Sequence, residues 1–320
     1  MKTNKLQYLL AIASFTGFLF TSCNKEEKLL SSTSGEVTVA QDNESQDALA
    51  EDINQSIDNT ADALEANNFS GMKSAMANGI TVTVDHPDTT TFPKVITITF
   101  NIDTTVNNEN MSQTGQVIIN VSLTHDAHPW RNYIKRAITF NQLTVTTDSS
   151  SFTIDGTRTM TRQSVDLSTD YATKLRLDVV DSITSDLNFY ITCGTYTGMF
   201  TRMAKREREA KVHFEKVTNG NIWYHAFTKD SLIYTGSVTG ENLLGNEYSR
   251  VITTPLLFTV CPVLPYNPII SQGKIEISNG TSTGSISYSA VGCKTGVTLN
   301  VNGRTRLIER KINRRYHKWW

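Results

Sequence analysis

The sequence predicts a mainly β protein: an antiparallel β sandwich or half-open barrel of two similar halves, preceded by one amphipathic helix. Many segments of the 320-residue chain alternate apolar and polar residues with a period of two, as strands with one buried face do. Thr, Ser, Asn and Val are abundant, and these residues favour strands and turns. The spacings between the segments are too short for crossover helices, so neighbouring strands are expected to be antiparallel.

Residues 44–71 are predicted to form the single helix, which Asn67, Asn68 and Gly71 end. Its narrow apolar stripe predicts packing on a sheet rather than in a membrane, because anionic headgroups would repel its acidic faces. The stripe consists of apolar residues spaced three or four apart, with Asp and Glu on the other faces: Leu49, Ile53, Ile57, Ala61 and Leu64.

The first half of the predicted β domain covers residues 80–165. Ile96, Ile98 and Phe100 occupy alternate positions and are expected to share one face, with Thr on the other. Asp155-Gly156 is expected to form a tight turn between strands. The expected strands are residues 80–84, 95–100, 116–123, 137–145 and 151–161.

The second half covers residues 166–308 in the same style. Three Asn-Gly pairs, at 219–220, 279–280 and 302–303, are hairpin signals because both residues tolerate positive φ. A strand opened by a glycine occurs in each half, at Gly115 and Gly273, which favours two related halves. The expected strands are residues 175–180, 188–192, 232–238, 250–260, 273–278, 285–288 and 296–301.

Residues 199–212 carry seven charged side chains and have the local propensity of a helix. The flanking strands favour a strand instead. A long charged strand at a sheet edge opposes edge-to-edge association, so we expect an edge strand whose charges are solvated.

The first 22 residues have the features of a signal peptide. Lys2 and Lys5 precede an apolar run, residues 9–20, that is too short to span a bilayer comfortably. Phe20-Thr21-Ser22 before Cys23 resembles the lipobox of bacterial lipoproteins. The resemblance implies that Cys23 is lipidated and becomes the first residue, which would anchor the protein in a membrane. The alternative is an ordinary secretory signal in which this cysteine is incidental.

The residues after the cysteine indicate where the anchored protein faces. Lys25-Glu26-Glu27 resembles the acidic surface-export signal of Bacteroidota lipoproteins, which implies an outer-membrane protein facing the cell exterior. The periplasmic face is the alternative. Residues 23–43 are expected to form a flexible tether. Residues 309–320 form a basic, aromatic tail that either contacts an anionic membrane surface or is solvated.

Four strand and turn patterns stand out: residues 92–100, Gly115-Gln116-Val117-Ile118, residues 154–159 and residues 292–303. Together they resemble an uncharacterised class of β-rich Bacteroidota lipoproteins, and the resemblance covers roughly residues 80–308. The class carries no activity that implies a catalytic residue here. At residues 290–292 the chain is poorer in Asp and Gly than such proteins, so no metal site is expected at that turn.

Composition limits the partners and the redox chemistry. Removing Lys2 and Lys5 with the signal peptide shifts the formal net charge of −1 to about −3, which gives no basic excess for nucleic acid. With Cys23 lipidated, three cysteines remain. In an oxidising compartment a disulfide between Cys261 and Cys293 is expected, because both lie at the ends of strand-like runs. The alternative is two buried free thiols.

The sequence contains few of the motifs that would indicate catalysis or cofactor binding. His125 and His128 are weak metal candidates, because Pro129 favours a loop and a zinc site would need further ligands. The sequence contains no Gly-x-Ser-x-Gly elbow, no phosphate loop of the Walker type and no dinucleotide fingerprint. We therefore expect no cofactor and assign no catalytic residue, which leaves enzyme activity uncertain.

Two functional classes follow from these observations. The favoured one is a non-catalytic binding or display module, attached to the membrane by its lipid, that presents a face or loops to a glycan, peptide or protein. Aromatic residues that would contact such a ligand are Trp130, Tyr133, Trp223 and Tyr224. The alternative is an envelope hydrolase or lipid carrier whose site is built from distant residues.

Overall fold

The computed structural model describes part of the chain between residues 74 and 310. The described ranges are 74–77, 79–86, 91–106, 109–123, 134–170, 174–194, 196–216, 223–225, 231–243, 245–260, 268–279, 283–301 and 304–310. The predicted signal peptide, the tether and the helix at residues 44–71 lie outside them, so these three remain predictions. The predicted tail begins inside the last strand, and residues 311–320 lie outside the described ranges.

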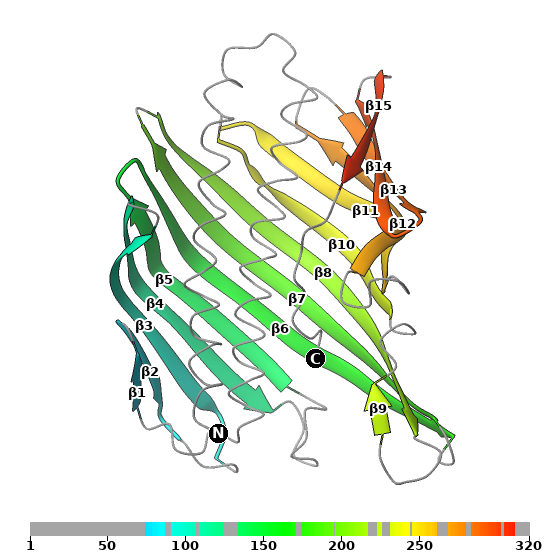
Figure 1. Ribbon diagram of the computed structural model, residues 1–320, viewed down its shortest axis with the longest axis horizontal. Helices are drawn as coiled ribbons and strands as arrows, with labels where there is room; N and C mark the ends of the chain where they lie inside the picture. Colours follow the sequence, from blue (N-terminus) through cyan, green and yellow to red (C-terminus); the bar gives the residue numbers. More distant parts are fainter. Residues whose placement is uncertain are drawn as a thin grey trace.

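The described residues form one antiparallel sheet of fifteen strands (Figure 1). The strands follow one another across the sheet in chain order, except that β9 pairs only with β8. Their bounds are β1 Ser74–Ala77, β2 Ile80–Val84, β3 Lys94–Val106, β4 Glu109–Leu123, β5 Ile134–Thr147, β6 Ser150–Asp170, β7 Lys174–Cys193, β8 Tyr196–Lys216, β9 Trp223–His225, β10 Ser231–Glu241, β11 Glu247–Val260, β12 Pro268–Ser278, β13 Thr283–Val291, β14 Lys294–Val301 and β15 Arg304–Arg310.

The prediction of a mainly β, antiparallel fold is confirmed. Of the two forms expected, a sandwich or a half-open barrel, the sandwich does not fit these residues, because all the described strands belong to one curved, open sheet rather than to two packed sheets. Short connections are the physical reason, since each one except that from β9 to β10 returns the chain beside the strand that it has just left. The expected boundary between two halves, at residues 165–166, falls inside β6, where pairing with β7 continues on both sides.

Turn chemistry accounts for some of these connections. Asn302-Gly303 separates β14 from β15, and Val301 pairs with Arg304 across it, as the hairpin signal predicted. The pair at 279–280 falls between β12 and β13, which are also antiparallel neighbours. The third pair, at 219–220, lies outside the described residues.

The predicted turn at Asp155-Gly156 is wrong, because both residues lie inside β6 and pair with β7. Gly156 has a φ of 124°, and a Cβ added there would lie 2.3 Å from the carbonyl oxygen of Asp186. The register between β5 and β6 shifts beside it, between Phe140 and Leu143. Gly156 therefore lies beside a β-bulge inside a long strand, where the neighbouring backbone leaves no room for a side chain, and it does not form a hairpin turn.

The charged segment 199–212 is a strand, as its context predicted, but it does not lie at an edge. It belongs to β8, which pairs with β7 on one side and with β10 on the other. Residues Met203 and Lys205 are exposed on one face, whereas Arg202 and Ala204 are buried on the other. Alternation therefore places three of the seven charged residues, Arg202, Arg206 and Arg208, on the face that carries buried residues, which contradicts a purely solvated role.

One face of the sheet, called the inner face below, carries the apolar core. On β7 and β8 it includes Phe189 and Phe200, both 0% exposed, whose rings stack at 4.3 Å between centroids. The largest cluster lies on β2 to β8 and comprises Ile80, Val82, Val84, Ile96, Ile98, Phe100, Ile102, Val117, Ile119, Val121, Ile138, Phe140, Leu143, Phe152, Ile154, Leu187, Phe189 and Phe200. A second cluster, on β11 to β14, includes Ile275, Ile286 and Leu299.

Candidate functional site

A band of arginine side chains crosses the inner face beside the apolar core. We call this set the arginine band, and it consists of Arg136 on β5, Arg158 and Arg162 on β6, Arg202, Arg206 and Arg208 on β8, and Arg250 on β11. Four of them, Arg136, Arg158, Arg202 and Arg250, are 1–4% exposed. Such burial of a guanidinium is rare in proteins unless the charge is paired.

Strand register brings these residues together from distant parts of the chain. Arg162 lies opposite Asp181, and Asp181 lies opposite Arg208 on the next strand. Two residues along, Arg206 pairs with Ile183. On the far side of β10, Arg250 pairs with Val238, which in turn pairs with Ala204. The band therefore extends sideways over six adjacent strands, from β5 to β11.

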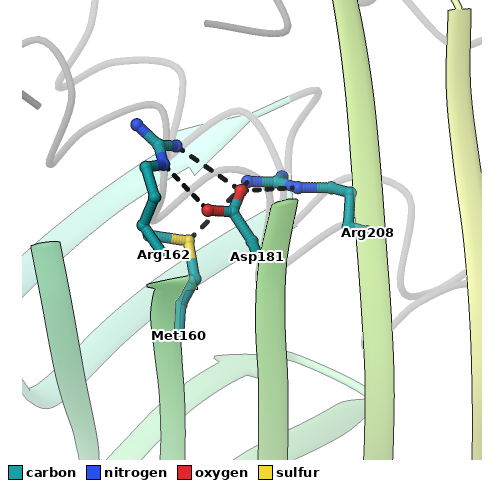
Figure 2. A network of polar contacts seen from close by, with 4 residues as sticks. All are labelled: Met160, Arg162, Asp181 and Arg208. Atoms are coloured by element: carbon teal, nitrogen blue, oxygen red, sulfur yellow. Dashed lines mark hydrogen bonds and ion pairs between the residues drawn. The ribbon is translucent and has the colours of Figure 1, made fainter. Parts of the chain in front are cut away.

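Asp181 is the centre of the best-defined contacts (Figure 2). Nε of Arg162 donates to Oδ1 of Asp181 at 2.8 Å, and its Nη2 donates to Oδ2 at 3.4 Å. From the other side, Nη2 and Nε of Arg208 both donate to Oδ2, at 2.5 and 3.2 Å. Nη2 of Arg208 also approaches the sulfur of Met160 at 3.7 Å. One carboxylate is thus clamped between two guanidinium groups.

The protonation state of Asp181 follows from this arrangement. Burial would raise the pKa of the carboxyl, because a buried charge loses hydration. The charges of Arg208 and Arg162 and their hydrogen bonds outweigh that effect and hold the pKa below its ordinary value. Asp181 is therefore ionised at neutral pH and neutralises part of the positive charge beside it.

Among the residues whose burial the structure describes, the buried charges are mostly positive. Asp181 is the only carboxylate among the buried residues that the structure describes, against Lys94 and the four buried arginines. Nη1 of Arg202 donates to the hydroxyl of Ser185 at 3.0 Å, which is a neutral partner. Every arginine of the band has at least one further interaction, so none of the seven is unpaired. The guanidinium groups of the band have the charge and planar shape that pair with carboxylate or phosphate groups.

Sequence reasoning missed the arginine band. The pattern of residues 199–212 predicts an edge strand with solvated charges, although the period of two places Arg202, Arg206 and Arg208 on the same face as Phe200. The same alternation in β6 places Arg158 with Ile154 and Met160, both buried. A positive charge in phase with an apolar stripe was the signal that could have identified this site.

The structure describes only some of the site residues that the sequence predicted. Cys293 is disulfide-bonded, whereas Cys261, its predicted partner, lies outside the described residues, so the pairing itself remains a prediction. Cys23, His125 and His128 also lie outside them. In the part of the chain that the structure describes, no group of three or more His, Cys, Asp or Glu residues could hold a metal ion.

Of the four aromatic residues predicted to contact a ligand, the structure describes two. Trp223 and Tyr224 lie in β9, which pairs with the end of β8, and Trp130 and Tyr133 lie outside the described residues. The arginine band is therefore the site that the structure itself provides.

Comparison with known proteins adds no relative. The chain matches no protein-family model, no curated protein and no solved structure. The described residues also contain no helix with the length and apolar character needed to cross a membrane.

Proposed function

We propose that the protein is a lipid-anchored component of the outer membrane, displayed on the cell surface, that acts as a non-catalytic binding module. Its ligand carries several carboxylate or phosphate groups, which pair with the arginine band. The observation that carries this proposal is the concentration of seven arginines on the inner face of one sheet, with Asp181 the only buried carboxylate among the described residues.

The energetics of buried charge support an anionic ligand. Removing a guanidinium from water costs several kcal/mol, and a negatively charged partner with good hydrogen bonds offsets this cost. The planar fork of Arg pairs with carboxylate and phosphate through two parallel hydrogen bonds, as it does between Arg162 and Asp181. A neutral ligand would not offset the cost in the same way.

Replacing Cys23 with Ala tests the anchor. Several acyl chains on one cysteine give stable membrane attachment, at about 0.8 kcal/mol for each buried CH₂ group. We therefore expect the wild type to partition into the detergent phase of a Triton X-114 extraction and the Cys23→Ala variant to move to the aqueous phase. Protease treatment of intact cells then tests surface display. Membrane fractionation of the variant like that of the wild type would contradict the anchor, and full protection from protease would contradict the display.

Replacing Arg206 with Gln tests the binding site. Tripolyphosphate is the probe, and its affinity for the full-length chain is measured by calorimetry at low and high salt. A hydrogen bond to a charged group contributes roughly 1.5 kcal/mol, so loss of this guanidinium is expected to weaken binding about tenfold. Salt should weaken binding to the wild type as well, because it screens charge.

A matched control lies on the same strand. Lys205 is exposed on the opposite face of β8, so Lys205→Gln removes the same charge without touching the arginine band. We expect its affinity for tripolyphosphate to equal that of the wild type. The Arg206→Lys variant, which keeps the charge but loses the planar fork, should fall between the two. Absence of binding to the wild type, or an equal loss in both Gln variants, would refute the proposed site.

A further inference from the structure

We infer that residues 44–66 of this chain dock on the arginine band and act as its internal anionic partner. This segment precedes the sheet and contains neither Lys nor Arg. Its carboxylates are opposite in charge to the arginines of the band. They number seven: Glu44, Asp47, Glu51, Asp52, Asp58, Asp62 and Glu65.

The spacing of the carboxylates along the segment is suited to contact with the elongated arginine band. In a helix with 3.6 residues per turn, six of them fall within roughly 60° of one another around the axis. The six are Glu44, Asp47, Glu51, Asp58, Asp62 and Glu65. The predicted helix would therefore present a continuous acidic stripe along one side, whereas a scattered arrangement would leave most of the acids facing away from any single surface.

The stripe is long enough to cross the whole band. From Glu44 to Glu65 a helix extends about 32 Å, at 1.5 Å per residue. The six adjacent strands from β5 to β11 span about 24 Å, at about 4.8 Å between neighbouring strands. A helix crossing these strands would thus bring carboxylates near arginines at both ends of the band.

The apolar side chains of the segment have a matching surface as well. Leu49, Ile53 and Ile57 belong to a stripe that lies roughly 125° around the predicted helix from the acidic one. On the sheet, the arginine band borders the apolar core, since Arg202 pairs with Leu187 while Phe200, two residues away, pairs with Phe189. One helix could therefore contact apolar residues and arginines at the same time, which links hydrophobic burial to charge pairing.

Docking of this segment has a regulatory consequence, which rests on the proposed function. An external anion and residues 44–66 would compete for the same guanidinium groups. The segment also follows the predicted lipid anchor and tether directly in the chain, so its release would change the connection between the sheet and the membrane. Ligand binding and the position of the sheet above the membrane would then be coupled.

Zero-length cross-linking of the full-length chain tests the inference. A carbodiimide joins a carboxylate to an amine only when the two are in contact. We use the variants Arg206→Lys and Arg250→Lys, each of which introduces an amine into the band, and identify linked peptides by mass spectrometry. We expect the introduced amines to link to carboxylates within residues 44–66. Lys205, on the opposite face of β8, is the internal control and should form no such link.

A second variant guards against non-specific links. In it all seven carboxylates of residues 44–66 are changed to Asn or Gln in the Arg206→Lys background, and the links to residues 44–66 should disappear. Links from the introduced amines only to other parts of the chain, or no links in either variant, would overturn the inference. Adding tripolyphosphate separates the two proposals. Fewer links in its presence support competition, whereas unchanged links with no bound tripolyphosphate would leave the docking correct and contradict the proposed ligand.

Discussion

Replacing Asp181 with Asn is expected to lower the free energy of unfolding by about 3 to 5 kcal/mol, the range for breaking a buried ion pair by removing one partner. The substitution keeps the shape of the side chain but removes the charge that Arg162 and Arg208 share. Both guanidinium groups would then lie beside each other without their common counter-ion. Urea denaturation followed by circular dichroism measures the change.

The control for this prediction is Asp186→Asn on the same strand. Asp186 is exposed on the opposite face of β7, so its replacement should change the free energy of unfolding by less than about 0.5 kcal/mol. If the Asp181→Asn variant were as stable as this control, the ion pairs of Asp181 with Arg162 and Arg208 would not contribute to the free energy of unfolding.

The same substitution should change how stability depends on pH. Because the pKa of Asp181 is lower in the folded protein, its stabilising contribution is fully present above the pKa of the unfolded chain, about 3.9. The contribution is lost as the pH falls through the lower pKa of the folded state. The wild type should therefore lose stability below about pH 4 more steeply than Asp181→Asn does. Parallel pH profiles would contradict this assignment.

Replacing Phe189 with Ala should be as costly, about 3 to 5 kcal/mol of unfolding free energy, because a cavity would remain where the ring was. The ring is 0% exposed, stacks on Phe200 and lies 5.8 Å from the ring of Phe152. Loss of this ring removes contacts that join β6, β7 and β8. Urea denaturation again gives the free energy, and thermal unfolding should show a lower midpoint.

The neighbouring residue supplies the control. Tyr190 lies opposite Met199 on the outer face and is 44% exposed, so Tyr190→Ala should cost no more than about 1 kcal/mol, the value of a cross-strand pair. Equal effects of the two substitutions would show that the inner face at Phe189 is not closely packed.

The strands were the predictable part of this fold. Ile96, Ile98 and Phe100 alternate with Thr in the sequence and are indeed buried together on β3. Strand ends and the long pairings were not predictable, because a glycine such as Gly156 has the same local signal in a turn as in a bulge, and only the neighbouring backbone decides between them. The number of sheets could not be derived from alternation either, since a period of two identifies a buried face but not what covers it.

The candidate site was less predictable for a different reason. A charged residue in a single sequence is most often solvated, and Arg202, Arg206 and Arg208 do not follow that rule. Arg202 is buried and Arg206 and Arg208 are partly buried, and β10, which pairs beyond β8, places their strand inside the sheet. Asp181 is separated from Arg162 by 19 residues and from Arg208 by 27, so register, and not sequence proximity, creates the ion pairs.

The chain-order arrangement of the strands has a consequence for biogenesis. Apart from the pairing of β8 with β10, each described strand pairs with the strand before or after it in sequence, so closing each pairing requires only a short loop. Folds dominated by such local contacts cross a lower entropic barrier than folds that join distant segments. A chain emerging gradually from the ribosome could therefore add one hairpin after another to a growing template, before its last strands are made.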